Sequence, residues 1–336
     1  MNKNVLAIAA ALTLAGGAAQ AQQMVFTSWG GTTQDAQTEF WAAPFTEKTG
    51  ITVVQDGPTD YGKIKAMVEA GATNWDVVDV EFDWALQAGN QGLLEPLDFT
   101  VIDKTSLDPR FVSDYAVGSF YYSFVMGWNE ANFGGDKPAT LADLFDTEKF
   151  PGKRTFYKWS APGVIEAALL ADGVAPDQLY PLDLDRAFAK LDTIKGDIIW
   201  WEGGAQSQQL LASGEAPIGF FWNGRLAALA ADGMPVGISW ENNITAADAL
   251  VVPKGAPNKD AAMAFIAKAT SAQAQADFAA ATGYAPINIG SADLMDPELR
   301  KTLPDSQTAA QVDADMAYWA QHRDEIGTRW YAWQAE

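Results

Sequence analysis

The sequence predicts an α/β fold in which helices cover the faces of a sheet, and its first eighty residues already show the pattern. Residues 24–29 form a strand-like run that ends at two glycines, and residues 34–45 carry apolar side chains at helical spacing. Residues 50–54 form a second strand, 63–70 a second helix and 76–80 a third strand. A chain of 336 residues is long enough for one large core or two modest ones.

The rest of the chain continues this alternation. Further strands are expected at 118–128, 218–222 and 249–253, a helix–loop unit at 138–150, and helices at 183–194, 206–213, 223–232 and 259–282. In such sheets ligands bind outside the carboxyl ends of the strands. The ends of the first and third strands, residues 28–31 and 81–84, are therefore the expected site, and both carry tryptophan and polar side chains.

Composition excludes several classes of function. With 43 acidic and 22 basic residues the net charge is −21, so the field of the protein repels phosphate backbones, and no nucleic-acid partner is expected. The chain has no Cys and one His, which excludes disulfides, thiolate nucleophiles and thiolate metal sites. No metal or cofactor is expected. The 13 Trp, 9 Tyr and 17 Phe exceed what a core needs, and some should line a binding site.

The first 21 residues have the features of a cleavable signal peptide and are excluded from the fold. Lys3 provides a positive charge, residues 5–15 are apolar, and Ala19-Gln20-Ala21 is a small-x-small cleavage pattern. The apolar run is shorter than the roughly 20 residues that span a bilayer. An exported, acidic, cysteine-free chain is expected to be periplasmic.

Seven short motifs in order make the mature chain resemble the solute-binding proteins of ABC importers, specifically the spermidine/putrescine-binding branch and its relatives. They are Trp29, residues 45–51, residues 75–78, residues 214–217, residues 222–224, residues 248–253 and residues 282–288. The resemblance implies the type II periplasmic binding protein fold, with two α/β lobes that close over one ligand. It also implies a monomer that delivers a small-molecule ligand to permease subunits in the inner membrane.

The same resemblance implies where the lobes divide. Lobe one comprises residues 22–127 and 248–284, and lobe two comprises residues 128–247 and 285–336. Ligand has to bind the closed form better than the open form for closure to signal occupancy.

The residues suggest an amine-binding site. Such a site needs aromatic walls for alkyl chains and carboxylates for ammonium groups. Trp29 and Trp222 each lie at a strand-to-turn junction, and Gly30 allows a close backbone approach beside the first. By resemblance, Asp248 holds an amine and Tyr284 closes the pocket.

Where the chain departs from polyamine binders, other residues are expected in the site. Glu81 and Asp83 replace a Ser and a Tyr of those relatives, and if extended they share one face. Polyamine binders also carry acids in the second lobe, and this chain lacks them. Trp159 stands at that place, and Trp201 is a candidate replacement. The ligand is therefore expected to be a polyamine or a smaller molecule with one cationic or quaternary amine.

Three alternatives stay open from the sequence. A secreted hydrolase could use Glu81 with Asp83 or Glu202 as acid and base, and tryptophan platforms also suit sugars. A ferric-ion binder could use Tyr121 and Tyr122, although adjacent strand residues point to opposite faces. We expect a receptor and not an enzyme.

Overall fold

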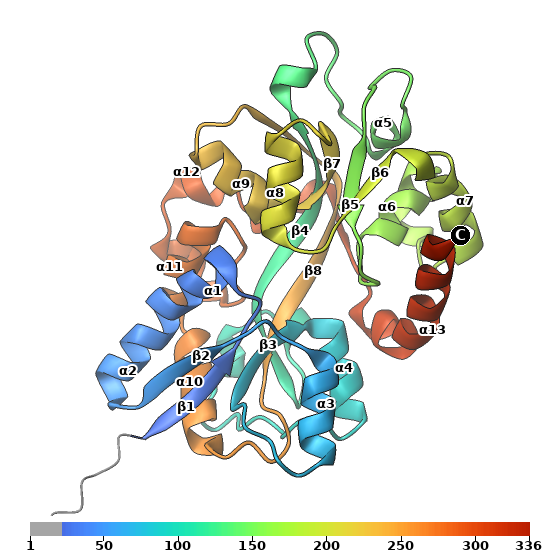
Figure 1. Cartoon of the computed structure of the whole chain (residues 1–336). Coiled ribbons are helices and arrows are strands. Elements are labelled where there is room, and N and C mark those ends of the chain that lie inside the picture. The colour runs from blue at the N-terminus through green and yellow to red at the C-terminus, as the bar shows by residue number, and fades with distance from the viewer. Residues whose placement is uncertain (1–21) are drawn as a thin grey trace, which may run out of the picture.

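A computed structural model describes residues 22–336, so the predicted signal peptide lies outside the described residues. In this part of the chain, nine strands form one twisted sheet in the order β2-β1-β3-β8-β4-β7-β5-β6, with β9 paired to β8. Lobe one is the half that contains β1, β2 and β3, at the bottom of Figure 1, and lobe two contains β5, β6 and β7. Helices cover both halves of the sheet (Figure 1), as the sequence predicts.

The strands are β1 (Gln23–Thr27), β2 (Thr52–Asp56), β3 (Val77–Glu81), β4 (Ala116–Asn129), β5 (Arg154–Tyr157), β6 (Ile198–Trp201), β7 (Ile218–Trp222), β8 (Val236–Val251) and β9 (Gln311–Asp313). The helices are α1 (Gly31–Gln37), α2 (Ala43–Thr49), α3 (Tyr61–Glu69), α4 (Phe82–Asn90), α5 (Leu141–Phe145), α6 (Val164–Ala171), α7 (Leu184–Asp192), α8 (Gly204–Ala212), α9 (Asn223–Ala231), α10 (Lys259–Ala269), α11 (Ala272–Thr282), α12 (Pro297–Arg300) and α13 (Met316–Ala335).

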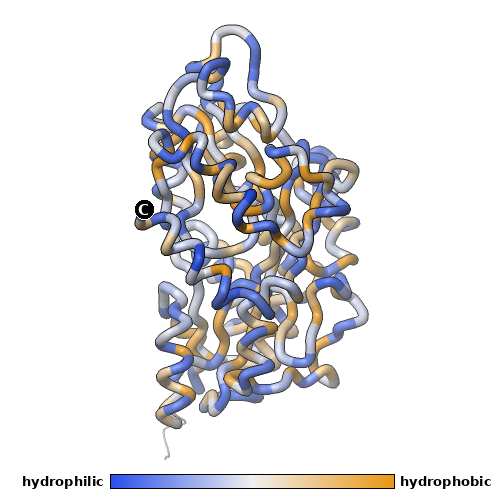
Figure 2. Tube along the Cα trace, turned by 90° about the vertical axis from the view of Figure 1, so that its right-hand side faces the viewer, coloured by the Kyte–Doolittle hydropathy of each residue, from blue (hydrophilic) through white to orange (hydrophobic). Residues whose placement is uncertain are grey.

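Amphipathic helices bury one face on the sheet. In α7, Leu184, Ala187, Phe188 and Leu191 recur at helical spacing and are all buried. Figure 2 shows the same alternation of hydrophobic and hydrophilic residues along other helical coils. Within the described residues no helix is both long and apolar enough to cross a membrane.

The two longest strands, β4 and β8, pass from one lobe to the other. They pair antiparallel from Ala116 opposite Val251 to Asn129 opposite Val236. The lobe divisions expected at 127/128 and 247/248 fall within these strands, and they remain predictions.

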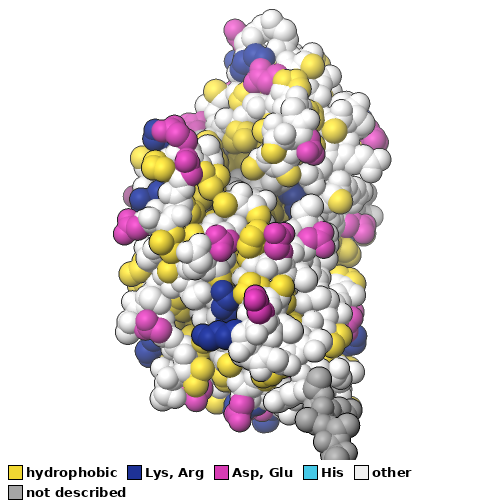
Figure 3. All heavy atoms as spheres, turned by 90° about the vertical axis from the view of Figure 1, so that its left-hand side faces the viewer, with side chains coloured by type: hydrophobic (Ala, Val, Ile, Leu, Met, Phe, Trp, Pro, Cys, Tyr) yellow, Lys and Arg dark blue, Asp and Glu magenta, His cyan; other side chains and the backbone are white. Residues whose placement is uncertain are grey.

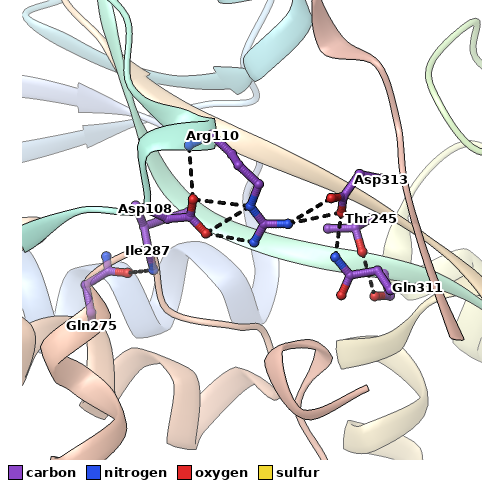
Figure 4. Close-up of polar contacts among 8 residues, drawn as sticks. Asp108, Arg110, Thr245, Gln275, Ile287, Gln311 and Asp313 are labelled. Carbon is purple, nitrogen blue, oxygen red and sulfur yellow. Dashed lines mark hydrogen bonds and ion pairs between the residues drawn. The ribbon is translucent and has the colours of Figure 1, made fainter. Parts of the chain in front are cut away.

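The lobe division expected at 284/285 also remains a prediction. The Ile287 amide donates to Gln275 Oε1 on α11, at 2.8 Å, so the chain still packs on lobe one here. It reaches β8 only at β9, where Arg110 of lobe one contacts both carboxylate oxygens of Asp313 at 3.0 and 3.1 Å (Figure 4). Residues 285–310 thus make contacts with lobe one before the chain pairs with β8 at β9.

Two element boundaries differ from the sequence prediction. The helix expected over 259–282 is two helices, since the hydroxyls of Thr270 and Ser271 bond the carbonyls of Ile266 and Lys268 and end the first. The strand expected at 249–253 begins thirteen residues earlier, at Val236, because its polar first half pairs with β4.

Candidate ligand-binding cleft

A cavity of about 470 Å³ lies between the lobes at the carboxyl ends of β1 and β3. It is lined by Trp29, Thr33, Pro58, Thr59, Tyr61, Glu81, Phe120, Tyr122, Tyr157, Trp159, Ser160, Glu202, Gly203, Gly204, Trp222, Arg225, Asp248, Tyr284, Arg323 and Tyr331. A second hollow, about 480 Å³, lies at the surface around α12 and shares no residue with the first. The inter-lobe cavity has the aromatic walls and few polar groups typical of a small-molecule site.

Sheet register brings three carboxylates to one face. Glu81 lies directly opposite Asp248 on the neighbouring strand, and Asp79 is two residues from Glu81 on the same face of β3. Like charges opposite each other destabilise a sheet. Burial, together with the charges of Asp79 and Glu81, raises the pKa of Asp248 well above its ordinary value. The fold therefore holds Asp248 in a position where a cationic partner would be strongly favoured.

Asp79 lies behind this site and is held by three side chains. Its carboxylate accepts hydrogen bonds from Gln37 Nε2 at 2.5 Å, Ser119 Oγ at 2.8 Å and Ser28 Oγ at 3.3 Å. Burial still raises the pKa of Asp79 to about 7, because the three donors offset only part of the desolvation. Asp79 is thus a structural carboxylate that adds negative potential behind Asp248.

The expected arrangement of Glu81 and Asp83 is wrong in its geometry. Glu81 ends β3, but Asp83 lies in the first turn of α4, so the two are not on one strand face. Both instead form ion pairs with Arg323, from Nη2 and Nη1 respectively, on the far helix α13. One guanidinium thus pairs with both carboxylates.

Asp248 differs from this pair. No ion pair or hydrogen bond within normal limits reaches its side chain from residues 22–336, although the Trp29 indole N–H lies near enough to lower its pKa somewhat. The side chain borders the cavity and the residue is only 6% exposed. The carboxylate therefore has no cationic partner among the described residues.

A second charged group, Arg225, enters the cavity from lobe two. It lies in the first turn of α9, directly after the strand-to-helix junction at Trp222. Nη1 donates to Thr32 Oγ1 at 2.9 Å and Nη2 to Thr33 Oγ1 at 3.2 Å, both on lobe one. Its buried Nε has no hydrogen-bond partner in the described chain. A guanidinium held by two neutral hydroxyls is suited to a carboxylate.

Gly204 makes room for this guanidinium. A Cβ on Gly204 would lie 2.0 Å from Arg225 Nε and 2.4 Å from its Cζ. Gly204 thus has a steric role, whereas a Cβ on Gly203 would meet no atom within 4 Å. Any side chain at residue 204 would displace Arg225.

Aromatic rings form the walls. Trp29 meets Tyr61 edge-on at 6.1 Å, and Tyr284 stacks on Phe120 with centroids 5.0 Å apart. Trp222 meets Tyr122 edge-on at 6.0 Å. These rings offer flat apolar surface to an alkyl chain.

Three further donors around the cavity are buried without a partner in the described chain. They are the indole N–H groups of Trp29 and Trp222 and the hydroxyl of Ser160. A buried donor left unpaired costs about 1–3 kcal/mol. Arg225 Nε belongs to the same group of unpaired donors in residues that line the cavity.

The structure separates the sequence-predicted site residues into two groups. Trp29, Glu81, Trp159, Trp222, Asp248 and Tyr284 line the cavity, whereas Gly30, Asp83 and Trp201 do not. Trp201 is fully buried behind the wall, edge-on to Trp222 at 4.7 Å, and Gly30 forms the turn into α1 with φ 78°. Trp159 is 41% exposed at the rim.

Sequence reasoning missed both arginines. Arg225 could have been found, because it follows Trp222-Asn223-Gly224 and is a rare cation in an acidic chain. Arg323 carried no local signal, since it reaches the cavity only when α13 packs on α4. Tyr121 and Tyr122 do face opposite sides: Tyr122 lines the cavity, and Tyr121 stacks on Phe111 at 5.5 Å outside it.

An inter-lobe cavity with charged groups from both halves is typical of a two-lobed solute receptor. A family model for bacterial extracellular solute-binding proteins matches residues 41–321. The chain belongs to this family, which is non-enzymatic.

Individual relatives agree with the assignment. The chain is 36% identical over 328 residues to the gamma-aminobutyric acid-binding protein of Pseudomonas aeruginosa, covering 94% of this chain and 92% of the relative. It is 24% identical to the spermidine/putrescine-binding periplasmic protein of Salmonella typhimurium, covering 80% of each. The solved structure of a GABA receptor is 73% identical with a TM-score of 0.90, covering 94% of this chain and 98% of that one.

The alternatives of a hydrolase, a sugar binder and a ferric-ion binder find no support in these relatives. Among the described residues there is also no group of three or more His, Asp or Glu side chains that could hold a metal ion.

Proposed function

We propose that this protein is the periplasmic receptor of an ABC importer for a short amino acid with its ammonium and carboxylate at opposite ends, of which γ-aminobutyric acid (GABA) is the type. The observation that carries the proposal is one cavity with one uncompensated carboxylate, Asp248, and one guanidinium with a free N–H, Arg225. The relatives named for GABA add independent support.

Each group of such a ligand has a complementary partner. The ammonium binds the Asp248 carboxylate and restores its charge balance. The ligand carboxylate accepts hydrogen bonds from Arg225. The methylene chain between them lies against Trp29, Trp222 and Tyr284. Pairing both charges offsets the desolvation of each, which a ligand with one charge cannot do.

Closure follows from the same contacts. Arg225 of lobe two already bonds Thr32 and Thr33 of lobe one, and a ligand carboxylate at Arg225 adds to this junction. Binding therefore favours the closed form that a permease would recognise. A monomer is expected to suffice, because residues of one chain complete the cavity.

Isothermal titration with GABA, butylamine and butyrate tests the proposal. GABA should bind, and each analogue, which lacks one charge, should bind at least tenfold more weakly. Equal binding of butylamine and GABA would show that Arg225 takes no ligand carboxylate. Putrescine binding tighter than GABA would show instead that the protein is a polyamine receptor.

A further inference from the structure

The cleft contains a cation of its own that the proposed ligand does not need. Arg323 projects from α13, near the C-terminus, across the cleft to lobe one. Its side chain is 13% exposed and borders the cavity. The guanidinium lies between the carboxylates of Glu81 and Asp83 and bonds both.

The surroundings hold this cation firmly. Its central carbon lies 5.5 Å from the centroid of the Tyr61 ring, which in turn stacks on Trp84 at 4.4 Å with the planes 7° apart. The Tyr61 hydroxyl donates to the same Glu81 oxygen that Arg323 bonds, at 3.0 Å. Burial opposes the charge of Arg323, but Asp83 and Glu81 outweigh it and raise its pKa well above the ordinary value.

This arrangement engages Glu81, one of the two carboxylates that lie opposite each other on β3 and β8 and line the cavity. Without Arg323, Glu81 and Asp248 would both line the cavity without a cation, and Asp83, buried outside the lining, would lose its ion-pair partner. Several carboxylates around an aromatic-walled cavity suit a ligand with two ammonium groups. With Arg323 in place, only Asp248 is left for a ligand cation.

We propose that Arg323 is a specificity-determining residue: a built-in cation that occupies Glu81 and Asp83, so that the cleft accepts ligands with one ammonium group and rejects diamines. This inference rests on the proposed function, because it explains how the same cavity discriminates GABA from putrescine. A diamine entering the cleft would place its second ammonium near a guanidinium with no free carboxylate, and like charges there oppose binding.

Arg323 also joins the lobes, so its loss has an effect common to all ligands. The contact between α13 and α4 includes a hydrogen bond from Gln87 to Asp324 at 3.2 Å. Weaker closure lowers every affinity by the same factor. The ratio of putrescine affinity to GABA affinity is therefore the informative quantity, because a purely structural role would leave it unchanged.

The experiment titrates GABA and putrescine into the wild-type protein, Arg323→Gln and the control Arg329→Gln. Arg329 lies on the same helix and pairs with Asp185 within lobe two, away from the cavity. In Arg323→Gln the putrescine-to-GABA affinity ratio should rise at least tenfold, while Arg329→Gln should keep the wild-type ratio. A ratio within threefold of wild type in Arg323→Gln would overturn the proposal.

A second variant tests the proposal in case Arg323→Gln does not fold. Arg323→Gln leaves two buried carboxylates without a partner, so the double variant Arg323→Gln/Asp83→Asn leaves only Glu81. The same tenfold rise is expected, and the same unchanged ratio would refute the proposal. Absence of GABA binding in the wild-type protein would instead refute the proposed function. The proposal on Arg323 would then be tested by putrescine affinity alone, compared between the wild-type protein and Arg323→Gln.

Discussion

Replacing Asp248 by Asn should weaken ligand binding and at the same time stabilise the ligand-free protein. The change keeps the shape of the side chain and removes its charge. Truncating one partner of a buried charge pair costs about 2–5 kcal/mol, so GABA affinity should fall by about 30-fold to about 4,000-fold. The loss arises because the ligand ammonium then lies buried without a carboxylate.

The ligand-free protein should respond in the opposite sense. Burial and the charges of Asp79 and Glu81 raise the pKa of Asp248, so its ionised form is unfavourable in the empty cleft. The neutral Asn removes that penalty, and the melting temperature without ligand should rise by about 2 °C for each kcal/mol gained. A residue that serves only the fold would lower the melting temperature.

Titration calorimetry and thermal unfolding at pH 7.5 measure the two effects. Asp305→Asn is the control, because burial also raises the pKa of Asp305 while it lies outside the cavity. The control should leave GABA affinity unchanged. Unchanged GABA affinity in Asp248→Asn, or a lowered melting temperature without ligand, would refute the assignment of Asp248 as the ammonium partner.

Three further predictions concern the other buried groups. Arg225→Gln should weaken GABA by about tenfold to about 150-fold more than it weakens butylamine in calorimetry, since a hydrogen bond to a charged group contributes about 1.5–3 kcal/mol. Its contacts with Thr32 and Thr33 affect both ligands alike, so an equal loss for both would contradict the role. Gly204→Ala should weaken GABA binding as Arg225→Gln does, because the alanine Cβ would lie 2.0 Å from Arg225 Nε. Wild-type GABA affinity in Gly204→Ala would show that Arg225 does not need that space. The pKa of Asp79 is about 7 in the folded protein and about 3.9 in the unfolded chain. Between these values the folded state binds more protons than the unfolded state. The free energy of unfolding should therefore rise as pH falls from about 8 to about 5. Chemical denaturation of Asp79→Asn should show a shallower rise, and an equal one would mean that Asp79 is ionised throughout.

Local sequence pattern predicted the parts of the site that strand ends determine. Trp29 and Trp222 lie at strand-to-turn junctions, where ligands of α/β sheets bind, whereas Asp248 was named only by resemblance to the family. The strand run at 76–80 likewise placed Glu81 correctly at the edge of the cavity. Such assignments need only the period of the side chains along a strand.

Contacts between distant segments could not be predicted in the same way. Glu81 and Arg323 are separated by 242 residues, and no sequence pattern near either residue indicates that α13 packs on α4. The two acids therefore looked like free anchors for a cationic ligand, although the fold supplies their cation. Arg110 and Asp313 likewise meet only in the folded chain, although 203 residues separate them.

Net charge also has to be interpreted together with the structure. The chain carries a charge of −21, and acidic side chains are spread over both lobes on the face drawn in Figure 3. Within the cleft, however, two arginines stand beside Glu81 and Asp248. The overall charge concentrates cations near the protein, whereas the local balance favours a zwitterion.

A crystal structure of the protein with GABA tests the central claim most directly. The ligand ammonium should lie within hydrogen-bond distance of the Asp248 carboxylate and the ligand carboxylate within that distance of Arg225, with the Arg323 pairs to Glu81 and Asp83 intact. A ligand bound in the reverse orientation, or with its ammonium on Glu81 in place of Arg323, would contradict the account.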